Sequence, residues 1–382
     1  MHVDTQLEAA LRALDHWPRF RLRLFFEGIV VGILSGTVIS FFRWGLEMGT
    51  VWRQWIYANV LASGGVLLNL SLFGVLLAAA LLLWHLGIYE PNAGGSGIPQ
   101  VKGVILGAIR MRWLRILWVK LIGGIVGIGM GLSLGREGPS IQIGAVTAQG
   151  LSRALGRTRM EERYLITAGA SAGLAAAFNA PLAGVMFALE ELHRNFSGVV
   201  LAPSMAAALL ATMVSRYVFG RAPVFHFGML PPFPLRYMWL VVILGIIIGL
   251  AGVVFNKGLL NIHYFYDLPV FRNNYMRIAF ALCMAGILGY VFPEVLGGGN
   301  DLVNSLYTLP LSLKLFAGLL IGKFLFTLVS YGCGVPGGFF LPMLVLGALT
   351  GGITGIVFVR LGLISSYYLS NIVVISMAAF FA

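Results

Sequence analysis

Glu137 is the residue whose type and surroundings most directly suggest chemistry. It lies in Gly135-Arg136-Glu137-Gly138-Pro139, and it is the only acid between Ile98 and Met160. Pro139 suits the first turn of a helix, and a helix N-terminus carries about half a positive charge that attracts anions. A carboxylate there can occupy the place of an anion and leave it on protonation, so the motif predicts a gate. A capping glutamate, or one paired with Arg136, is the alternative that the motif leaves open.

Two further glycine-rich loops could hold an anion without a charged side chain. Gly337-Gly338-Phe339-Phe340-Leu341-Pro342 contains no ionisable residue, so only its backbone N–H groups could bind an anion at a helix start. Ser96, in Gly94-Gly95-Ser96-Gly97-Ile98-Pro99, offers a hydroxyl donor beside another expected helix start. The alternatives are a Gly-Gly kink that lets helices cross in the first of these loops and an N-cap serine in the second.

Other charged residues lie in or beside apolar segments. Glu190-Glu191 follows the apolar segment 182–189. This pair either lies in solvent or forms a proton port, because carboxylates at membrane depth serve in proton relays. Lys120 and Lys323 lie within apolar runs, where they either snorkel to the interface or add a positive field.

Patterns for an enzyme are weak. Gly94-Gly95-Ser96-Gly97 satisfies the G-x-S-G string of intramembrane serine proteases, which would need His85 or His263 as a partner. Glu190 and His193 form a single E-x-x-H, whereas a di-iron bundle needs two. Nucleotide loops and zinc signatures are absent from the sequence, so we expect no metal site and no cofactor.

The composition sets the environment in which these residues must work. Of 382 residues, 10% are charged and 59% apolar, against roughly 25% charged in ordinary soluble domains, and the mean hydropathy is +0.90. At roughly 20 residues a span, that apolar content is enough for about ten or eleven helices. The sequence therefore predicts an all-α polytopic membrane protein. Its net charge of +12 does not indicate nucleic-acid binding, because the Lys and Arg residues stand singly between apolar runs.

Nine runs are long and apolar enough to span a membrane. They fall at about 25–49, 66–88, 113–134, 164–189, 198–219, 237–262, 277–293, 311–331 and 341–362. Residues 1–24 are polar with helical spacing, which predicts an amphipathic N-terminal helix at the membrane surface. Four arginines before the first run predict a cytoplasmic N-terminus by the positive-inside rule.

The chain also repeats itself at an offset of 203 residues. Lys120, Gly135 and Pro139 then align with Lys323, Gly338 and Pro342, and Gly94–Gly97 aligns with 297–300. We therefore expect two transmembrane repeats, 25–225 and 226–382. The second repeat stops where the first continues, so it is expected to lack its C-terminal end.

These motifs together resemble the three signature loops of the CLC chloride channel and transporter family. The matching loops are Gly95-Ser96-Gly97-Ile98-Pro99, Gly135-Arg136-Glu137-Gly138-Pro139 and Gly338-Phe339-Phe340-Leu341-Pro342. The segment 167–191, with its Ala-rich run and Asn179-Ala180-Pro181, is similar to that family as well. The resemblance implies an inverted repeat of tilted and broken helices, and a homodimer with one anion pathway in each subunit.

The resemblance also assigns roles. Ser96 and the backbone N–H groups of Phe339 and Phe340 would bind chloride, Glu137 would be the external gate, and Glu191 the internal proton glutamate. We therefore expect a prokaryotic chloride/proton antiporter of the inner membrane, with a passive chloride channel as the alternative and a protease as a distant one. The anion-contacting tyrosine of the family lies in a final helix that this chain does not reach.

Overall fold

The computed structural model describes residues 2–382 except 64, 195, 223, 226, 228, 229 and 307–311, and it describes side chains from Phe20 onward outside 60–63. The chain forms two compact units. One comprises Met1–Arg43, Gly97–Trp118 and Ser140–Pro223, and the other Trp44–Ser96, Val119–Pro139 and Val224–Ala382. The units interleave along the chain and do not follow the predicted repeats 25–225 and 226–382. That division, based on sequence similarity, stays a prediction.

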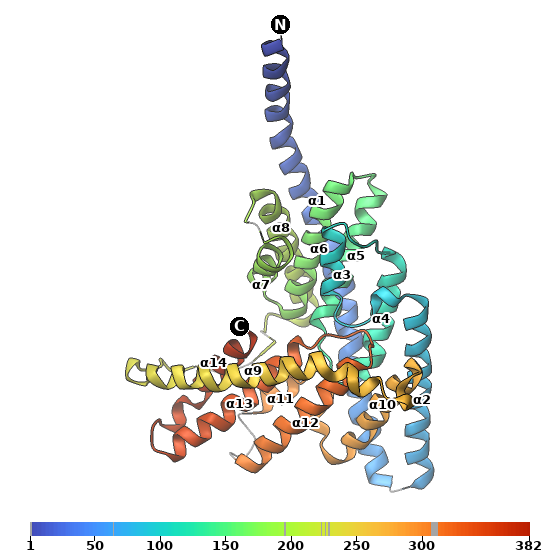
Figure 1. Cartoon of the computed structure of the whole chain (residues 1–382), viewed down its shortest axis with the longest axis vertical. Helices are drawn as coiled ribbons and strands as arrows, with labels where there is room; N and C mark the ends of the chain where they lie inside the picture. The colour runs from blue at the N-terminus through green and yellow to red at the C-terminus, as the bar shows by residue number, and fades with distance from the viewer. Residues whose placement is uncertain are drawn as a thin grey trace. The chain divides into compact units, whose positions relative to one another are not determined.

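All regular structure in the described residues is helical, apart from one isolated β-bridge. Figure 1 labels the α-helices, which are α1 (His2–Ser63), α2 (Val66–Tyr89), α3 (Ile98–Ile105), α4 (Trp113–Gly129), α5 (Glu137–Ala154), α6 (Arg159–Phe178), α7 (Pro181–Phe187), α8 (Gly198–Phe219), α9 (Met238–Tyr266), α10 (Asn274–Val291), α11 (Asn300–Ser305), α12 (Leu313–Gly332), α13 (Phe340–Arg360) and α14 (Leu369–Phe381). Short 3-10 turns precede several helices, and a π-helical turn, η2 (Ala188–His193), follows α7.

Seven segments of the described chain are long and apolar enough to cross a membrane. They are Phe20–Asn59, Val66–Tyr89, Gly198–Phe219, Leu235–Tyr266, Asn274–Val291, Leu313–Gly332 and Phe340–Arg360. The predicted run 164–189 forms two helices, α6 and α7. Asn179 adopts a left-handed conformation at φ 60° and Pro181 starts α7, so the chain breaks between them.

The first predicted run, 25–49, ends too early. Helix α1 continues to Ser63, past Arg53, whose guanidinium donates 3.2 Å hydrogen bonds to the carbonyls of Ile128 and Gly129 at the end of α4. The charge of Arg53 is thus satisfied by carbonyls of another helix. The predicted N-terminal helix 1–24 is the beginning of this same continuous helix, and its position on the membrane surface stays a prediction.

In the first unit, α1 and α8 pack through small residues. Gly28, Gly32 and Gly36 recur every four residues on α1, and a Cβ at Gly28 or Gly32 would lie under 3 Å from the backbone of α8. The facing positions on α8 are also spaced by four: Pro203, Ala207 and Ala211. Such stripes let helix backbones approach closely where lipid leaves no hydrophobic drive for association.

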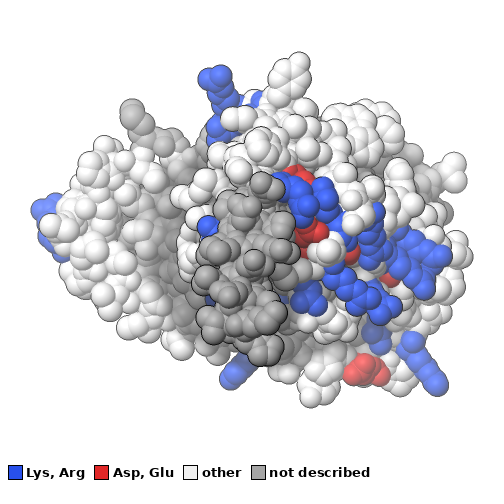
Figure 2. Space-filling view, turned by 90° about the horizontal axis from the view of Figure 1, so that it is seen from above, with Lys and Arg blue, Asp and Glu red and all other residues white. Residues whose placement is uncertain are grey.

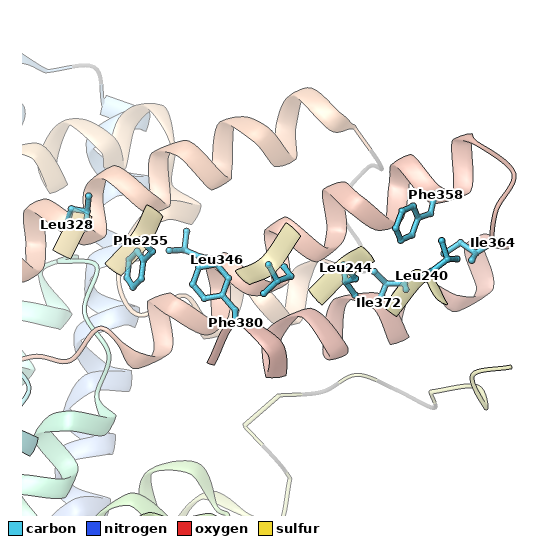
Figure 3. Close-up of a cluster of buried hydrophobic side chains, with 10 residues drawn as sticks. Leu240, Leu244, Phe255, Leu328, Leu346, Phe358, Ile364, Ile372 and Phe380 are labelled. Carbon is cyan, nitrogen blue, oxygen red and sulfur yellow. The ribbon is translucent and has the colours of Figure 1, made fainter. Parts of the chain in front are cut away.

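The second unit has its core between α9, α13 and α14, which lie beside one another in Figure 1. Figure 3 shows Leu240 and Leu244 of α9 beside Ile372 of α14, with Phe358 and Ile364 at the end of the row. Phe255 and Phe380 stack edge to face with ring centroids 6.0 Å apart. Burial of this apolar row holds α13, which carries one of the predicted anion loops, against α9 and α14.

The repeat is visible in the order of the elements. Helices α2, α4 and α5 of the first copy correspond to α10, α12 and α13 of the second. The predicted offset of 203 is wrong for the first loop, where the backbone gives 202. Gly95 and Gly97 have φ of 61° and 95°, and their counterparts Gly297 and Gly299 have 66° and 94°. Left-handed backbone needs glycine, so these pairs fix the alignment, and Ser96 corresponds to Gly298.

Candidate functional site

Three glycine loops meet in the second unit. Gly135 and Gly338, which occupy equivalent positions in the repeat, form an antiparallel bridge: the Gly135 N–H donates to the Gly338 carbonyl at 2.6 Å and the Gly338 N–H to the Gly135 carbonyl at 2.9 Å. The Gly337 N–H donates to the Gly95 carbonyl at 3.0 Å. Loops that lie more than 200 residues apart in the chain are therefore joined through their backbones.

The close approach of these loops depends on Gly138. A Cβ at this position would lie 2.7 Å from the carbonyl oxygen of Ser96 and 3.0 Å from its Cα. Backbone cannot move aside as a flexible side chain can, so glycine lets Ser96 lie against the start of α5. Gly338 also packs closely against Gly138, because a Cβ added at Gly338 would lie 3.3 Å from the Gly138 nitrogen.

Glu137 begins α5 and is 1% exposed. Both of its carboxylate oxygens are buried and have no hydrogen-bond partner among the described residues. The backbone N–H groups of Glu137 and Leu341 face the carboxylate, and Leu341 lies in the first turn of α13. The two alternatives stay open, because backbone N–H groups at two helix starts face the carboxylate and the charge of Arg136 acts on it. The side chain lies at the start of its own helix and beside the start of α13, where two partial positive charges favour an anion.

Ser96 is buried, at 7% exposure. The interpretation of this residue as an N-cap is wrong, because Gly97 occupies the cap position of α3 and no side-chain cap bond forms. The left-handed backbone at Gly95 and Gly97, on either side of the serine, is accessible to glycine at little cost. The Ser96 hydroxyl is consequently free of a structural task among the described residues and remains available as a donor.

Phe339 and Phe340 stand at the N-terminus of α13, with Phe339 in the cap position. The first N–H groups of an α-helix have no carbonyl partner within the helix. The two rings point to different neighbours: Phe339 packs on Tyr331 with centroids 5.1 Å apart, and Phe340 on Phe381 at 4.6 Å. Aromatic packing therefore anchors the loop, and neither ring needs the backbone N–H groups of the helix start.

Two buried lysines hold two of the glycine loops through hydrogen bonds to backbone carbonyls. The Lys120 ammonium donates to the carbonyls of Ala93 and Gly95 at 2.9 and 2.7 Å, and Lys323 donates to those of Val295 and Gly297 at 2.8 and 2.6 Å. Both lysines are 0% exposed, so snorkelling is wrong for each. The matching hydrogen bonds show a clamp that recurs in both copies, next to Ser96 in the first and next to Gly298 in the second.

A protein-family model and two relatives match most of this chain. The family model described as voltage gated chloride channel matches residues 74–382. The chain belongs to the voltage gated chloride channel (CLC) family. It is 34% identical to the H(+)/Cl(-) exchange transporter ClcA of Vibrio vulnificus (strain YJ016), over 86% of this chain and 72% of that protein. It is also 34% identical to ClcA of Salmonella agona (strain SL483), over 89% of this chain and 73% of that protein.

Solved structures of the CLC family have the same fold. A slow cyanobacterial Cl-/H+ antiporter superposes with a TM-score of 0.82 at 31% identity, covering 89% of this chain and 80% of that one. A CLC-type fluoride/proton antiporter superposes with a TM-score of 0.76 at 24% identity, covering 94% and 86%. The predicted all-α polytopic fold of the CLC type is confirmed.

Glu191, the other predicted proton residue, lies in the first unit on the π-helical turn η2. Its carboxylate accepts a hydrogen bond from Lys102 of α3 at 2.7 Å, and the Glu191 side chain is 47% exposed. Glu190 is exposed. The adjacent acids thus differ, since of the two only Glu191 forms an ion pair within the part of the chain that the structure describes. Sequence analysis missed Lys102, which lies 89 residues away in the chain.

The residues of the enzyme alternatives do not assemble. The His85 ring contacts the Leu81 carbonyl and the His263 ring the Leu260 carbonyl, each on its own helix, so neither is a partner of Ser96. The His193 ring lies 2.8 Å from the Thr167 hydroxyl. No group of three metal-ligating side chains occurs among the residues that the structure describes. The remaining motif residues lie at the helix starts. Ile98 and Pro99 are in the first turn of α3, Arg136 directly precedes α5, and Pro139 and Pro342 are in the first turns of α5 and α13.

Proposed function

We propose that this chain exchanges chloride for protons across a membrane, with the Glu137 carboxylate as the gate. The observation that carries the proposal is the buried Glu137 carboxylate, which faces the backbone N–H groups of Glu137 and Leu341 at the N-termini of α5 and α13. Relatives of similar sequence are named for this exchange, and so is a structural neighbour at 31% identity.

The chemistry follows from the loops. Ionised Glu137 occupies the place of an anion at the two helix N-termini. Protonation removes its charge, and with it the attraction to these helix ends. Chloride then enters and accepts hydrogen bonds from the Ser96 hydroxyl and from the backbone N–H groups of Phe339 and Phe340. When chloride leaves, the carboxylate returns and releases its proton. One helix-terminal position thus serves two anions alternately, which couples the movement of chloride to that of the proton.

Glu191 is the proton acceptor toward the other aqueous side in this scheme. It is partly exposed, and its carboxylate is paired with Lys102 of α3 at 2.7 Å. Exposed ion pairs are weak, at about 0–1 kcal/mol, so Lys102 does not fix the side chain in one position.

The molecular setting completes the proposal. The protein works in a bacterial inner membrane with its N-terminus in the cytoplasm, because the arginines before the first span follow the positive-inside rule. It acts as a homodimer, each subunit with its own pathway, and it needs no cofactor. These statements rest on the family resemblance and on the charge pattern.

The test is ion flux from liposomes that contain the 382-residue chain, with chloride efflux and internal pH recorded together. Proton uptake driven by the chloride gradient supports the exchange, whereas chloride efflux without a pH change supports a passive channel. Glu137→Gln is expected to pass chloride without protons. Glu191→Gln is expected to stop proton movement, and Glu190→Gln, at the exposed neighbour, is the matched control that should behave as the parent protein.

A further inference from the structure

The first unit carries a surface of unusual charge. The segments 20–27, 106–115 and 153–163 contain nine arginines and three glutamates. They hold no lysine, although the chain has five. The net charge of +6 is half of the +12 of the whole chain. Figure 2 shows basic side chains gathered on one face, with a few acidic side chains among them.

The three segments are neighbours in space, as their contacts show. Arg23 of α1 pairs with Glu161 of α6, and Arg157 pairs with Glu27 of α1. The loop between α3 and α4 joins them, because a Cβ at Gly107 would lie 2.7 Å from the Arg163 guanidinium. We call the surface formed by these three segments the arginine face.

The acids of the arginine face are already engaged. Glu27 and Glu161 have the partners just named, and Glu162 pairs with Arg153 at 3.4 Å. Four exposed arginines have no ion pair among the described residues: Arg110, Arg112, Arg159 and Arg163. Guanidinium groups bind phosphate oxygens in a bidentate manner that an ammonium group cannot match. The unneutralised charge and its chemical type therefore fit a phosphate-bearing ligand.

Apolar side chains identify the kind of phosphate ligand. Leu106 and Met160 are 70% and 53% exposed, and each stands within four residues of an unpaired arginine. Exposed Phe26, Leu114 and Leu155 lie in the same three segments. Soluble phosphates and nucleic acids have no acyl chains that would contact these apolar side chains. A phospholipid uses both, because its headgroup meets arginine while its acyl chains meet apolar side chains.

We propose that the arginine face binds the phosphate groups of anionic phospholipids through Arg110, Arg112, Arg159 and Arg163. The site lies outside the glycine loops and is independent of chloride/proton exchange. Bound lipid bridges the α3–α4 loop and the start of α6, so it fastens together two segments of the first unit. The attraction weakens with salt over a screening length of about 10 Å at 0.1 M.

The experiment uses the full chain in detergent with phosphatidylglycerol or phosphatidylcholine of equal acyl length, and retained lipid is measured by native mass spectrometry. We expect phosphatidylglycerol to be retained at least tenfold more strongly and to raise the melting temperature. Arg110→Gln/Arg163→Gln is expected to reduce that retention about tenfold or more. Arg272→Gln/Arg360→Gln, at exposed arginines of the second unit, removes the same charge and is expected to leave retention unchanged.

Three results would overturn the proposal. The first is equal retention of the two lipids. The second is an equal loss in both double variants, which would mean that total charge and no particular surface attracts the lipid. In the third, millimolar inorganic phosphate displaces phosphatidylglycerol and gives the same thermal stabilisation, so that the ligand is a free phosphate. The double variants report on folding through their melting temperatures without lipid, which must match that of the parent protein for the comparison to count.

Discussion

Replacement of Lys120 by methionine tests whether the lysine clamp positions Ser96 or merely adds positive charge. Methionine has a similar volume and no charge, so the replacement removes the two hydrogen bonds to Ala93 and Gly95 without a large cavity. Gly95 keeps its bond from the Gly337 N–H. The Ala93 carbonyl loses its ammonium donor, and a buried acceptor left without one costs about 1–3 kcal/mol.

The effect on chloride follows from the position of the clamp. Gly95 precedes Ser96 directly, so a loosened loop misplaces the hydroxyl that we propose binds chloride. A hydrogen bond to a charged group contributes about 1.5–3 kcal/mol, and 1.4 kcal/mol is a factor of ten in affinity. We therefore expect Lys120→Met to raise the chloride Kd about tenfold or more, as measured by isothermal titration calorimetry on the purified protein.

The second copy of the clamp provides the matched control. Lys323 is equally buried and makes the same two kinds of hydrogen bond, but the residue beside its loop that corresponds to Ser96 is Gly298, which has no hydroxyl. Lys323→Met removes the same charge and should cost similar stability, yet it should leave the chloride Kd within about twofold. If both variants weaken chloride binding equally, the lysines act through their electric field, and the positioning argument is refuted.

Three further predictions concern packing and proton access. Gly32→Leu forces a side chain onto the backbone of α8 and should cost about 1–3 kcal/mol or more, seen as a lower melting temperature, whereas Gly245→Leu, in open space on α9, should not change it. Gly138→Ala should weaken chloride binding in calorimetry, because its Cβ meets the backbone of Ser96; unchanged affinity would contradict the close packing of these loops. Lys102→Met should alter the proton flux in liposomes by up to about fivefold, since an exposed ion pair contributes at most about 1 kcal/mol, with chloride affinity unchanged; an altered affinity would show that Lys102 acts on the anion site as well.

The sequence predicted the structure well wherever a particular backbone geometry requires a particular residue type. Glycines at left-handed positions and prolines in first helical turns mark the three loops, and the repeat offset pairs Gly135 with Gly338 long before their bridge is visible. Helix boundaries were harder to predict from the sequence than the loops. The first run was predicted to end at 49, whereas α1 continues to Ser63. No sequence pattern indicates that the carbonyls of Ile128 and Gly129 will accept hydrogen bonds from Arg53 on this extension.

Long-range polar partners were the least predictable part. Snorkelling was the simpler interpretation of Lys120 and Lys323, because a lysine in an apolar run normally reaches for water. Their true partners are carbonyls of a preceding loop, whose return to the lysine depends on the whole packing of the unit. The only available signal was their recurrence in both copies, which a snorkelling side chain does not require.

The duplicated scaffold and the unduplicated chemistry together explain how one site can serve two anions. Each copy supplies a lysine clamp, a pair of left-handed glycines and a helix N-terminus, but at the positions of Ser96 and Glu137 only the first supplies a polar side chain. Glu137 corresponds to Phe340 and Ser96 to Gly298. The carboxylate of the first copy thus faces a helix N-terminus of the second that has no acid of its own. A second acid there would compete with chloride whatever the state of Glu137, whereas bare backbone N–H groups can donate to either the carboxylate or chloride. The presence of an acid in only one copy at this position is therefore what makes a protonation-controlled exchange between carboxylate and chloride possible.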